Sequence, residues 1–148
     1  MKDGKIDMNY LLSDFQAYWR ENSEIWKDRY EKEIYQYAEA APHLVLQAFL
    51  QRVVNGGAQI IREMALGSMR ADLCIIYEDQ KYPIEIKLLY DSNTIKKGLE
   101  QTYNYMTKCG TNEGWLVVFD KDTQKPWEEK IYMRTETFNG KNITVVGV

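Results

Sequence analysis

Residues 63–88 read Glu63-Met-Ala-Leu-Gly-Ser-Met-Arg-Ala-Asp72-Leu-Cys-Ile-Ile-Tyr-Glu-Asp-Gln-Lys-Tyr-Pro-Ile-Glu85-Ile-Lys87-Leu, and this stretch decides the fold. Two apolar runs flank the polar residues 78–81, which is the pattern of a β-hairpin. We therefore predict strands over residues 71–77 and 82–89, joined by a short turn.

The parity of this hairpin places three charged residues on one face. Side chains along a strand alternate between faces, so Glu85 and Lys87 share a face. A turn centred between residues 78 and 79 puts Asp72 opposite Glu85, and a turn centred one residue later puts it opposite Lys87. Both registers gather the three side chains, whereas a bulge or a three-residue loop would separate them.

Charges on a sheet face that packs against a core are costly unless they are paired or bound to a metal. A Glu-x-Lys tripeptide alone is common by chance, but here an Asp precedes the Glu by thirteen positions across a hairpin. A helix predicted over residues 95–108 also carries Gln101 and Tyr105, whose i, i+4 spacing puts them on one helix face. These residues together are candidates for one site.

Asp72 and Glu85-Ile86-Lys87 resemble the first acidic residue and the (D/E)XK motif of the PD-(D/E)XK nuclease superfamily. Gln101 and Tyr105 resemble the Gln-x-x-x-Tyr motif of its RecB-like members. The Pro of the family name is missing, since Ala71 precedes Asp72. Runs 47–57 and 70–73 also resemble a nuclease-like domain at the C-terminus of some prokaryotic AAA-type ATPases.

The resemblance implies a metal-dependent nuclease that hydrolyses phosphodiester bonds in DNA. It implies Mg²⁺ or Mn²⁺ as the cofactor, since hard cations prefer carboxylates, carbonyls and water. The ligands it implies are Asp72, Glu85, the backbone carbonyl of Ile86 and, through water, Glu63.

The resemblance also implies roles outside the metal shell. Lys87 would orient the attacking water and offset negative charge in the transition state. Gln101 would hold Lys87 or a phosphate, while Tyr105 and Arg70 would contact the nucleic acid. The plainer interpretations stay open: a structural ion-pair cluster around Lys87, ordinary helix packing for Gln101 and Tyr105, and an exposed strand-end arginine for Arg70.

The rest of the chain predicts an α/β fold in which a mixed central sheet is flanked by helices, and the resemblance implies that its core is restriction-endonuclease-like. Residues 1–42 form an N-terminal helical extension, and residues 43–148 form the nuclease-like domain with a C-terminal pair of strands, all one compact unit. The elements predicted are helices 9–20 and 24–40 separated by Asn22-Ser23, helix 43–54, strand 58–66, the hairpin, helix 95–108 capped by Asn93 or Thr94, strand 115–119, and strands 130–134 and 143–148 joined near Asn139-Gly140.

The net charge of −3 argues against a strong nucleic-acid binder. Residues 1–42 hold 6 Lys and Arg against 9 Asp and Glu, whereas residues 43–148 hold 13 of each. Affinity for nucleic acid is therefore expected to come from a partner or a fused ATPase domain. The alternative is a non-catalytic interaction or regulatory domain that retains the nuclease fold. The resemblance implies DNA as the nucleic acid, but the sequence itself leaves DNA versus RNA open, and the oligomeric state as well.

Several classes of protein are disfavoured. The sequence has no apolar run long enough for a membrane span and no apolar signal core near Met1, so we expect a cytoplasmic protein. His43 is the only histidine, which leaves little support for histidine-based nuclease or Ser-His hydrolase chemistry, and we predict a surface or capping role for it. The two cysteines lack metal-ligand spacing, and no phosphate loop occurs, so the chain is not itself an ATPase.

Overall fold

The computed structural model describes residues 5–32, 40–53, 57–66, 69–120, 122 and 124–148, with only the backbone described for residues 23–32, 40, 41, 53, 63–66 and 69–71. The elements are α1 (Met8–Lys32), α2 (Ala40–Val53), β1 (Gln59–Leu66), β2 (Met69–Tyr77), β3 (Gln80–Leu88), α3 (Asn93–Cys109), β4 (Glu113–Phe119), α4 (Trp127–Lys130), β5 (Tyr132–Phe138) and β6 (Lys141–Gly147).

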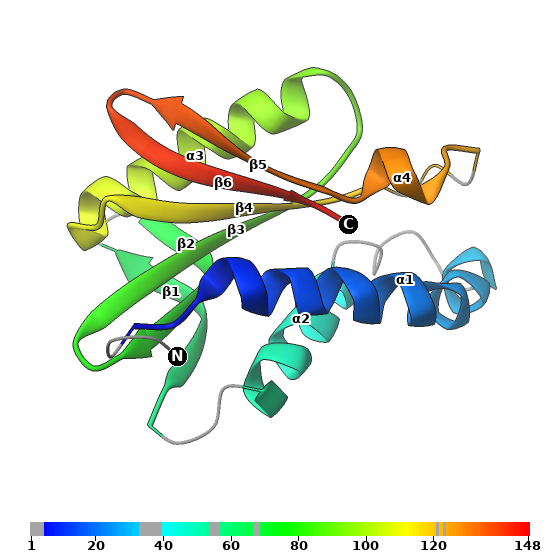
Figure 1. Cartoon of the computed structure of the whole chain (residues 1–148), viewed down its shortest axis with the longest axis horizontal. Helices are drawn as coiled ribbons and strands as arrows, with labels where there is room; N and C mark the ends of the chain where they lie inside the picture. The colour runs from blue at the N-terminus through cyan, green and yellow to red at the C-terminus, as the bar shows by residue number, and fades with distance from the viewer. Residues whose placement is uncertain (1–4, 33–39, 54–56, 67–68, 121, 123) are drawn as a thin grey trace.

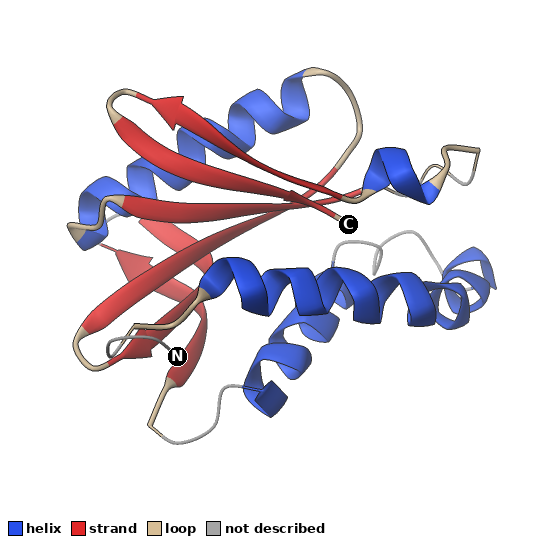
Figure 2. Ribbon diagram, viewed as in Figure 1, coloured by secondary structure: helices blue, strands red, loops and turns tan. Residues whose placement is uncertain are grey.

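The strands form one six-stranded sheet in the order β1-β2-β3-β4-β6-β5 (Figures 1 and 2). Strands β1 to β3 pair antiparallel, β4 runs parallel to both β3 and β6, and β5 is an antiparallel edge strand. The predicted α/β class, with a mixed sheet flanked by helices, is confirmed. No helix within the described ranges is long and apolar enough to cross a membrane.

The β2–β3 hairpin has the first of the two predicted registers. Tyr77 pairs with Gln80 and Leu73 pairs with Ile84, so the loop consists of Glu78 and Asp79. Both loop residues have positive φ, 47° and 64°, which is the backbone of the tight turns that match the twist of a hairpin. The same register places Asp72 opposite Glu85.

Two apolar clusters lie on opposite faces of the sheet. On one face, α1 and α2 pack on Ile84, Ile86 and Leu88 of β3 and on alternate residues of β4. On the other face, Met106 of α3 packs on the remaining β4 residues and on β6. Because β3 alternates, its apolar residues face α1 and α2, and Glu85 and Lys87 are left on the α3 face.

The predicted break at Asn22-Ser23 is wrong, because α1 runs without interruption to Lys32. The Asn22 side-chain amide donates to the Tyr18 carbonyl, 2.8 Å away, so it bonds back along the helix instead of ending it. The predicted helix 24–40 is therefore partly a continuation of α1, and residues 33–39 lie outside the described part of the chain. The start of α1 buries four apolar side chains in the sheet core: Met8, Leu11, Leu12 and Phe15.

The C-terminal strands are confirmed with shifted bounds, because Lys130 ends α4 and the strands run over Tyr132–Phe138 and Lys141–Gly147 instead of 130–134 and 143–148. They are joined by Asn139 and Gly140, both with positive φ (49° and 80°). The single turn α4 was not predicted. Gly110 ends α3 in the left-handed conformation, with φ of 73°.

Helix α3 lies very close to the sheet at Gly98. A Cβ atom on Gly98 would lie 2.7 Å from a methyl carbon of Leu116 and 3.3 Å from Cγ of Lys87. The missing side chain therefore lets α3 approach β3 and β4 and cover the stem of Lys87.

We predict that Gly98→Ala destabilises the protein. At an uncrowded helix position this change would stabilise by about 1 kcal/mol, but overpacking at a close contact costs about 1–3 kcal/mol. Urea unfolding measures the sign, with the exposed α3 variant Glu100→Ala as control. A higher unfolding midpoint for Gly98→Ala would contradict the close approach.

Candidate active site

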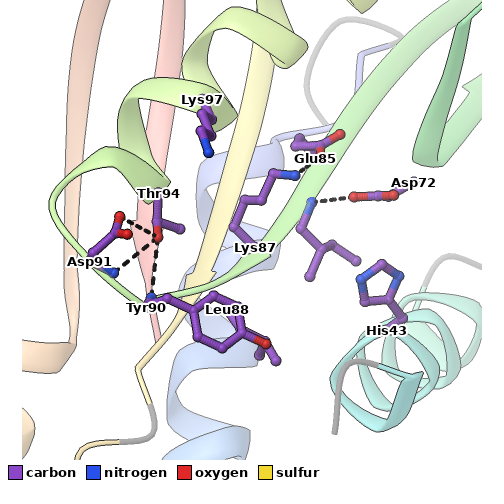
Figure 3. A pocket seen from close by; sticks show the side chains of 10 residues that line it. His43, Asp72, Glu85, Lys87, Leu88, Tyr90, Asp91, Thr94 and Lys97 are labelled. Atoms are coloured by element: carbon purple, nitrogen blue, oxygen red, sulfur yellow. Dashed lines mark hydrogen bonds and ion pairs between the residues drawn. The ribbon is translucent and has the colours of Figure 1, made fainter. Parts of the chain in front are cut away.

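A cavity of about 300 Å³ opens at the end of β3 (Figure 3). Its walls come from β2, β3, the β3–α3 loop, the start of α3 and the first turns of α2. The residues that line it are His43, Asp72, Glu85, Ile86, Lys87, Leu88, Tyr90, Asp91, Thr94 and Lys97. Asp72, Glu85 and Lys87 are thus brought together, as the hairpin parity predicted.

Asp72 lies where the paired part of β2 ends beside β3. Its Oδ2 accepts a hydrogen bond from the Ile86 backbone N–H at 2.8 Å, taking the place of a carbonyl from the neighbouring strand. The N–H and C=O of one residue point to the same neighbouring strand. The Ile86 carbonyl therefore faces the β2 side as well.

Glu85 is a buried carboxyl with one oxygen unsatisfied. Its side chain is 2% exposed, and Oε1 lies 3.2 Å from Nζ of Lys87. Oε2 has no hydrogen-bond partner among the described residues. Burial raises the pKa of Glu85 from 4.5 to about 8; the charge of Asp72 adds to this rise, and Lys87 opposes it. Without a further cation, the carboxyl is therefore mostly protonated at neutral pH.

Tyr105 approaches this cluster from α3. Its side chain is buried, and burial raises the pKa of its phenol, with further increases from the charges of Glu85 and Asp72. Gln101 lies one turn earlier, and its amide oxygen is buried with no hydrogen-bond partner in the described part of the chain. Neither residue is among those that line the open cavity.

Two predicted site residues are described only by their backbone. Glu63 lies in β1, in a ladder whose register puts it opposite Asp72, and Arg70 lies near the start of β2, paired with Ala65. The side chains of Glu63 and Arg70 lie outside the described part of the structure, and their roles stay predictions.

The sequence did not indicate the outer wall of the cavity. The β3–α3 loop contributes Tyr90, and α3 contributes Lys97. Thr94 does not cap α3, which begins at Asn93; its hydroxyl instead accepts the backbone N–H groups of Tyr90 and Asp91, each at 3.2 Å. These positions depend on how the loop folds back over β3, which no local sequence signal encodes.

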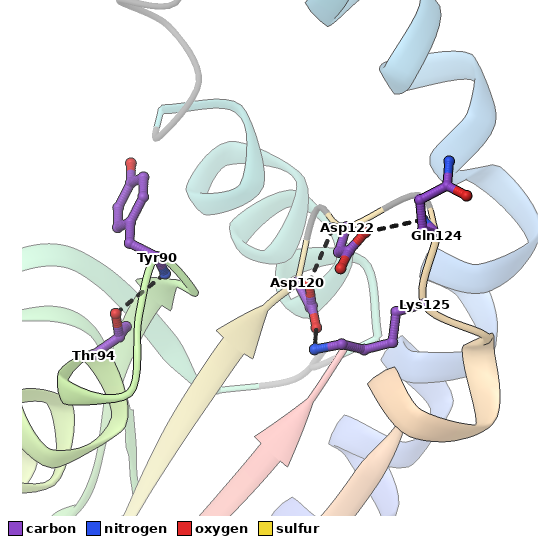
Figure 4. A network of polar contacts seen from close by, with 6 residues as sticks. All are labelled: Tyr90, Thr94, Asp120, Asp122, Gln124 and Lys125. Atoms are coloured by element: carbon purple, nitrogen blue, oxygen red, sulfur yellow. Dashed lines mark hydrogen bonds and ion pairs between the residues drawn. The ribbon is translucent and has the colours of Figure 1, made fainter.

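A third carboxylate near the end of the sheet belongs to a separate network. Asp120 follows β4 and forms an ion pair with Lys125 (Figure 4). Burial alone would raise the pKa of Asp120, but the hydrogen bonds from Lys125 and the Asp122 amide outweigh it and hold that pKa below its usual value. Asp120 does not line the cavity. In the described ranges, no group of three or more His, Cys, Asp or Glu residues forms a metal centre.

The sequence of this chain matches a known family model. A family described as Domain of unknown function (DUF8371) matches residues 8–123. The chain belongs to this family. The match begins at the start of α1 and extends beyond β4, so it includes the whole candidate site. No curated protein matches the chain.

We predict that Glu85 makes stability fall as pH rises. The folded carboxyl, with a pKa of about 8, holds a proton that the unfolded chain loses near pH 4.5. The stabilisation is complete below the unfolded pKa and is lost as pH passes through the folded pKa, by at most about 1.4 kcal/mol per pH unit. Glu85→Gln should remove this slope and be more stable than the wild type above pH 8.

The measurement is urea unfolding across pH without divalent ions, and the exposed Glu113→Gln serves as the control. Equal slopes in the wild type and Glu85→Gln would show that the buried carboxyl is not protonated in the folded state.

Proposed function

We propose that this chain is a metal-dependent nuclease of the PD-(D/E)XK type, with a restriction-endonuclease-like core, that hydrolyses phosphodiester bonds in DNA. The element order from α2 through the three strands to α3 and β4 supports this. The observation that carries the proposal is the unsatisfied, buried Oε2 of Glu85 beside Asp72, in the wall of an open cavity.

The residues present fit a hard divalent cation such as Mg²⁺ or Mn²⁺. Asp72 can accept the Ile86 amide with one oxygen and still offer the other, because a carboxylate has several acceptor sites. Mg²⁺ needs only one or two carboxylates, with water completing its shell. Oε2 of Glu85 has no hydrogen-bond partner among the described residues, so this oxygen is available to a cation.

A bound divalent ion would polarise the scissile phosphate and lower the pKa of a coordinated water. Asp72, Glu85 and the Ile86 carbonyl are the groups that would hold it, with Glu63 acting through water. Lys87 lines the cavity with its amine beside Glu85, so it would orient the attacking water and offset charge on the phosphate.

The residues around this centre would support it. Tyr105 keeps its phenolic proton because its pKa is raised, so it remains a donor to Glu85 or to a phosphate. Gln101 would hold Lys87 or a phosphate with its amide, and Arg70 would contact the nucleic-acid backbone. The balanced charge of residues 43–148 suggests that a partner or a fused ATPase domain supplies much of the affinity for DNA.

We predict that Lys87→Ala abolishes cleavage but leaves divalent-ion binding largely intact, since an ammonium is not a ligand. Loss of one such electrostatic group costs roughly 10²- to 10³-fold in rate. Lys87→Arg should rescue poorly, because a broad guanidinium does not replace a compact ammonium. Glu85→Gln should instead lose ion binding. Calorimetry with Mg²⁺ or Mn²⁺, alongside turnover of labelled DNA, measures both properties.

The matched control is Lys81→Ala, on the same strand and at the same parity but at its opposite end. It should keep both ion binding and turnover. If the wild type binds no divalent ion and cleaves nothing in its presence, the chain is instead a non-catalytic interaction domain that retains the fold.

A further inference from the structure

Tyr90 is a large aromatic side chain exposed at the cavity that holds Asp72 and Glu85. It follows β3 directly, lines the cavity and is 71% exposed. In Figure 3 its ring lies in front of the end of β3, between the start of α3 and His43 on α2. A ligand that covers this ring would recover the hydrophobic free energy that its exposure to water costs.

The backbone around Tyr90 is held firmly although the ring is exposed. Thr94 accepts the N–H groups of Tyr90 and Asp91, and Asp91 in turn accepts the N–H of Asn93 at 2.8 Å. One residue earlier, the Leu89 N–H donates to the Phe119 carbonyl at 2.8 Å, which ties the loop to β4. Figure 4 shows the Tyr90 ring pointing away from Thr94. The backbone that carries the ring is thus held in place before a ligand binds, which reduces the entropy lost on binding.

The charges of the cavity suit one strand of nucleic acid, with few phosphates in contact, better than a duplex. Lys87 and Lys97 line it, but Asp72 and Asp91 line it too. Tight binding of a duplex relies on many phosphate contacts by cations. With so few cations in the cavity, another interaction has to supply affinity, and stacking on the Tyr90 ring is the one that the geometry offers.

We propose that this cavity takes single-stranded nucleic acid, with a base stacked on Tyr90 and a neighbouring phosphate held by Lys97. The proposal rests on the proposed nuclease function and names its substrate class. Inside a duplex both faces of a base are covered by its neighbours, so the ring can stack only on an unpaired or terminal base. Stacking of this kind tolerates any base sequence, because every base has a π-face.

Direct binding tests the platform without requiring turnover. The probe is a fluorescent oligothymidylate, titrated at low salt without divalent ions and compared with the same strand annealed to oligoadenylate. The single strand should bind more tightly than the duplex. Tyr90→Ala should weaken single-strand binding roughly tenfold, which lies within the range for the loss of one stacked base. Duplex binding should stay unchanged.

Two variants separate stacking from other effects of Tyr90. Tyr90→Phe keeps the ring and loses the hydroxyl, so it should bind like the wild type. Tyr10→Ala removes an equally exposed tyrosine of α1, 67% exposed and outside the cavity, and should have no effect. The proposal falls if the duplex binds as tightly as the single strand, or if Tyr90→Ala binds the single strand as tightly as the wild type. It also falls if Tyr90→Phe loses as much affinity as Tyr90→Ala.

The Lys97 contact has its own control in the neighbouring residue. Lys96 and Lys97 are both exposed on α3, but only Lys97 lines the cavity. Lys97→Ala should flatten the dependence of log K on log salt by roughly 0.7, the value for one phosphate of a single strand. Lys96→Ala should leave the slope unchanged, and equal slopes for the two variants would refute the assigned contact.

The outcomes also distinguish the two proposals from each other. Single-strand binding that depends on Tyr90, without cleavage in Mg²⁺ or Mn²⁺, would overturn the nuclease function and support the binding mode. Cleavage that depends on Lys87, with equal rates for Tyr90→Ala and the wild type on single strands, would support the nuclease function and overturn the platform.

Discussion

The grouping of Asp72 with Glu85 and Lys87 depends on the two-residue turn at Glu78 and Asp79. Its left-handed backbone fixes the register of β2 against β3, and a slip by one residue would turn every side chain of a strand to the other face. Such a slip in β3 would drive Glu85 into the core now filled by Ile84 and Ile86. Burying an unpaired charge there costs far more than a positive φ at two exposed residues. The apolar core therefore enforces the arrangement of the polar face.

The polar face remains a weak point in the packing of the sheet. Glu85 is buried under α3 with one oxygen unsatisfied, and its raised pKa shows that the folded protein disfavours the charge there. A neutral Gln or an apolar residue at position 85 would cost less free energy of burial than a carboxylate. Perturbed carboxyls beside a second carboxylate and an amine are common at functional sites, although structural networks also produce them. This cluster borders an open cavity, which is the feature on which the proposed function relies.

Periodicity predicted the parts of the fold whose side chains alternate regularly. The hairpin, β4 and α3 carry clear apolar patterns, so their faces, and with them the grouping of Asp72 and Glu85, could be derived from sequence. The continuity of α1 could not, because Asn22 is ambiguous locally and here bonds back to Tyr18. The cavity wall of Tyr90 and Lys97 was missed for another reason: it depends on a loop held to β4 and α3 by backbone hydrogen bonds.

The topology explains why the cavity lies where it does. β3 is the strand at which the antiparallel part of the sheet meets the parallel part, and the chain leaves its carboxyl end to form α3. In open α/β sheets, ligands bind outside the carboxyl ends of parallel strands, because the connecting loops separate there. Here β2 pairs with β3 only up to Leu73, and beyond it Asp72 replaces a strand carbonyl at the Ile86 amide. The cavity thus lies where the backbone pairing of β2 and β3 ends, with Asp72 and Glu85 in its wall.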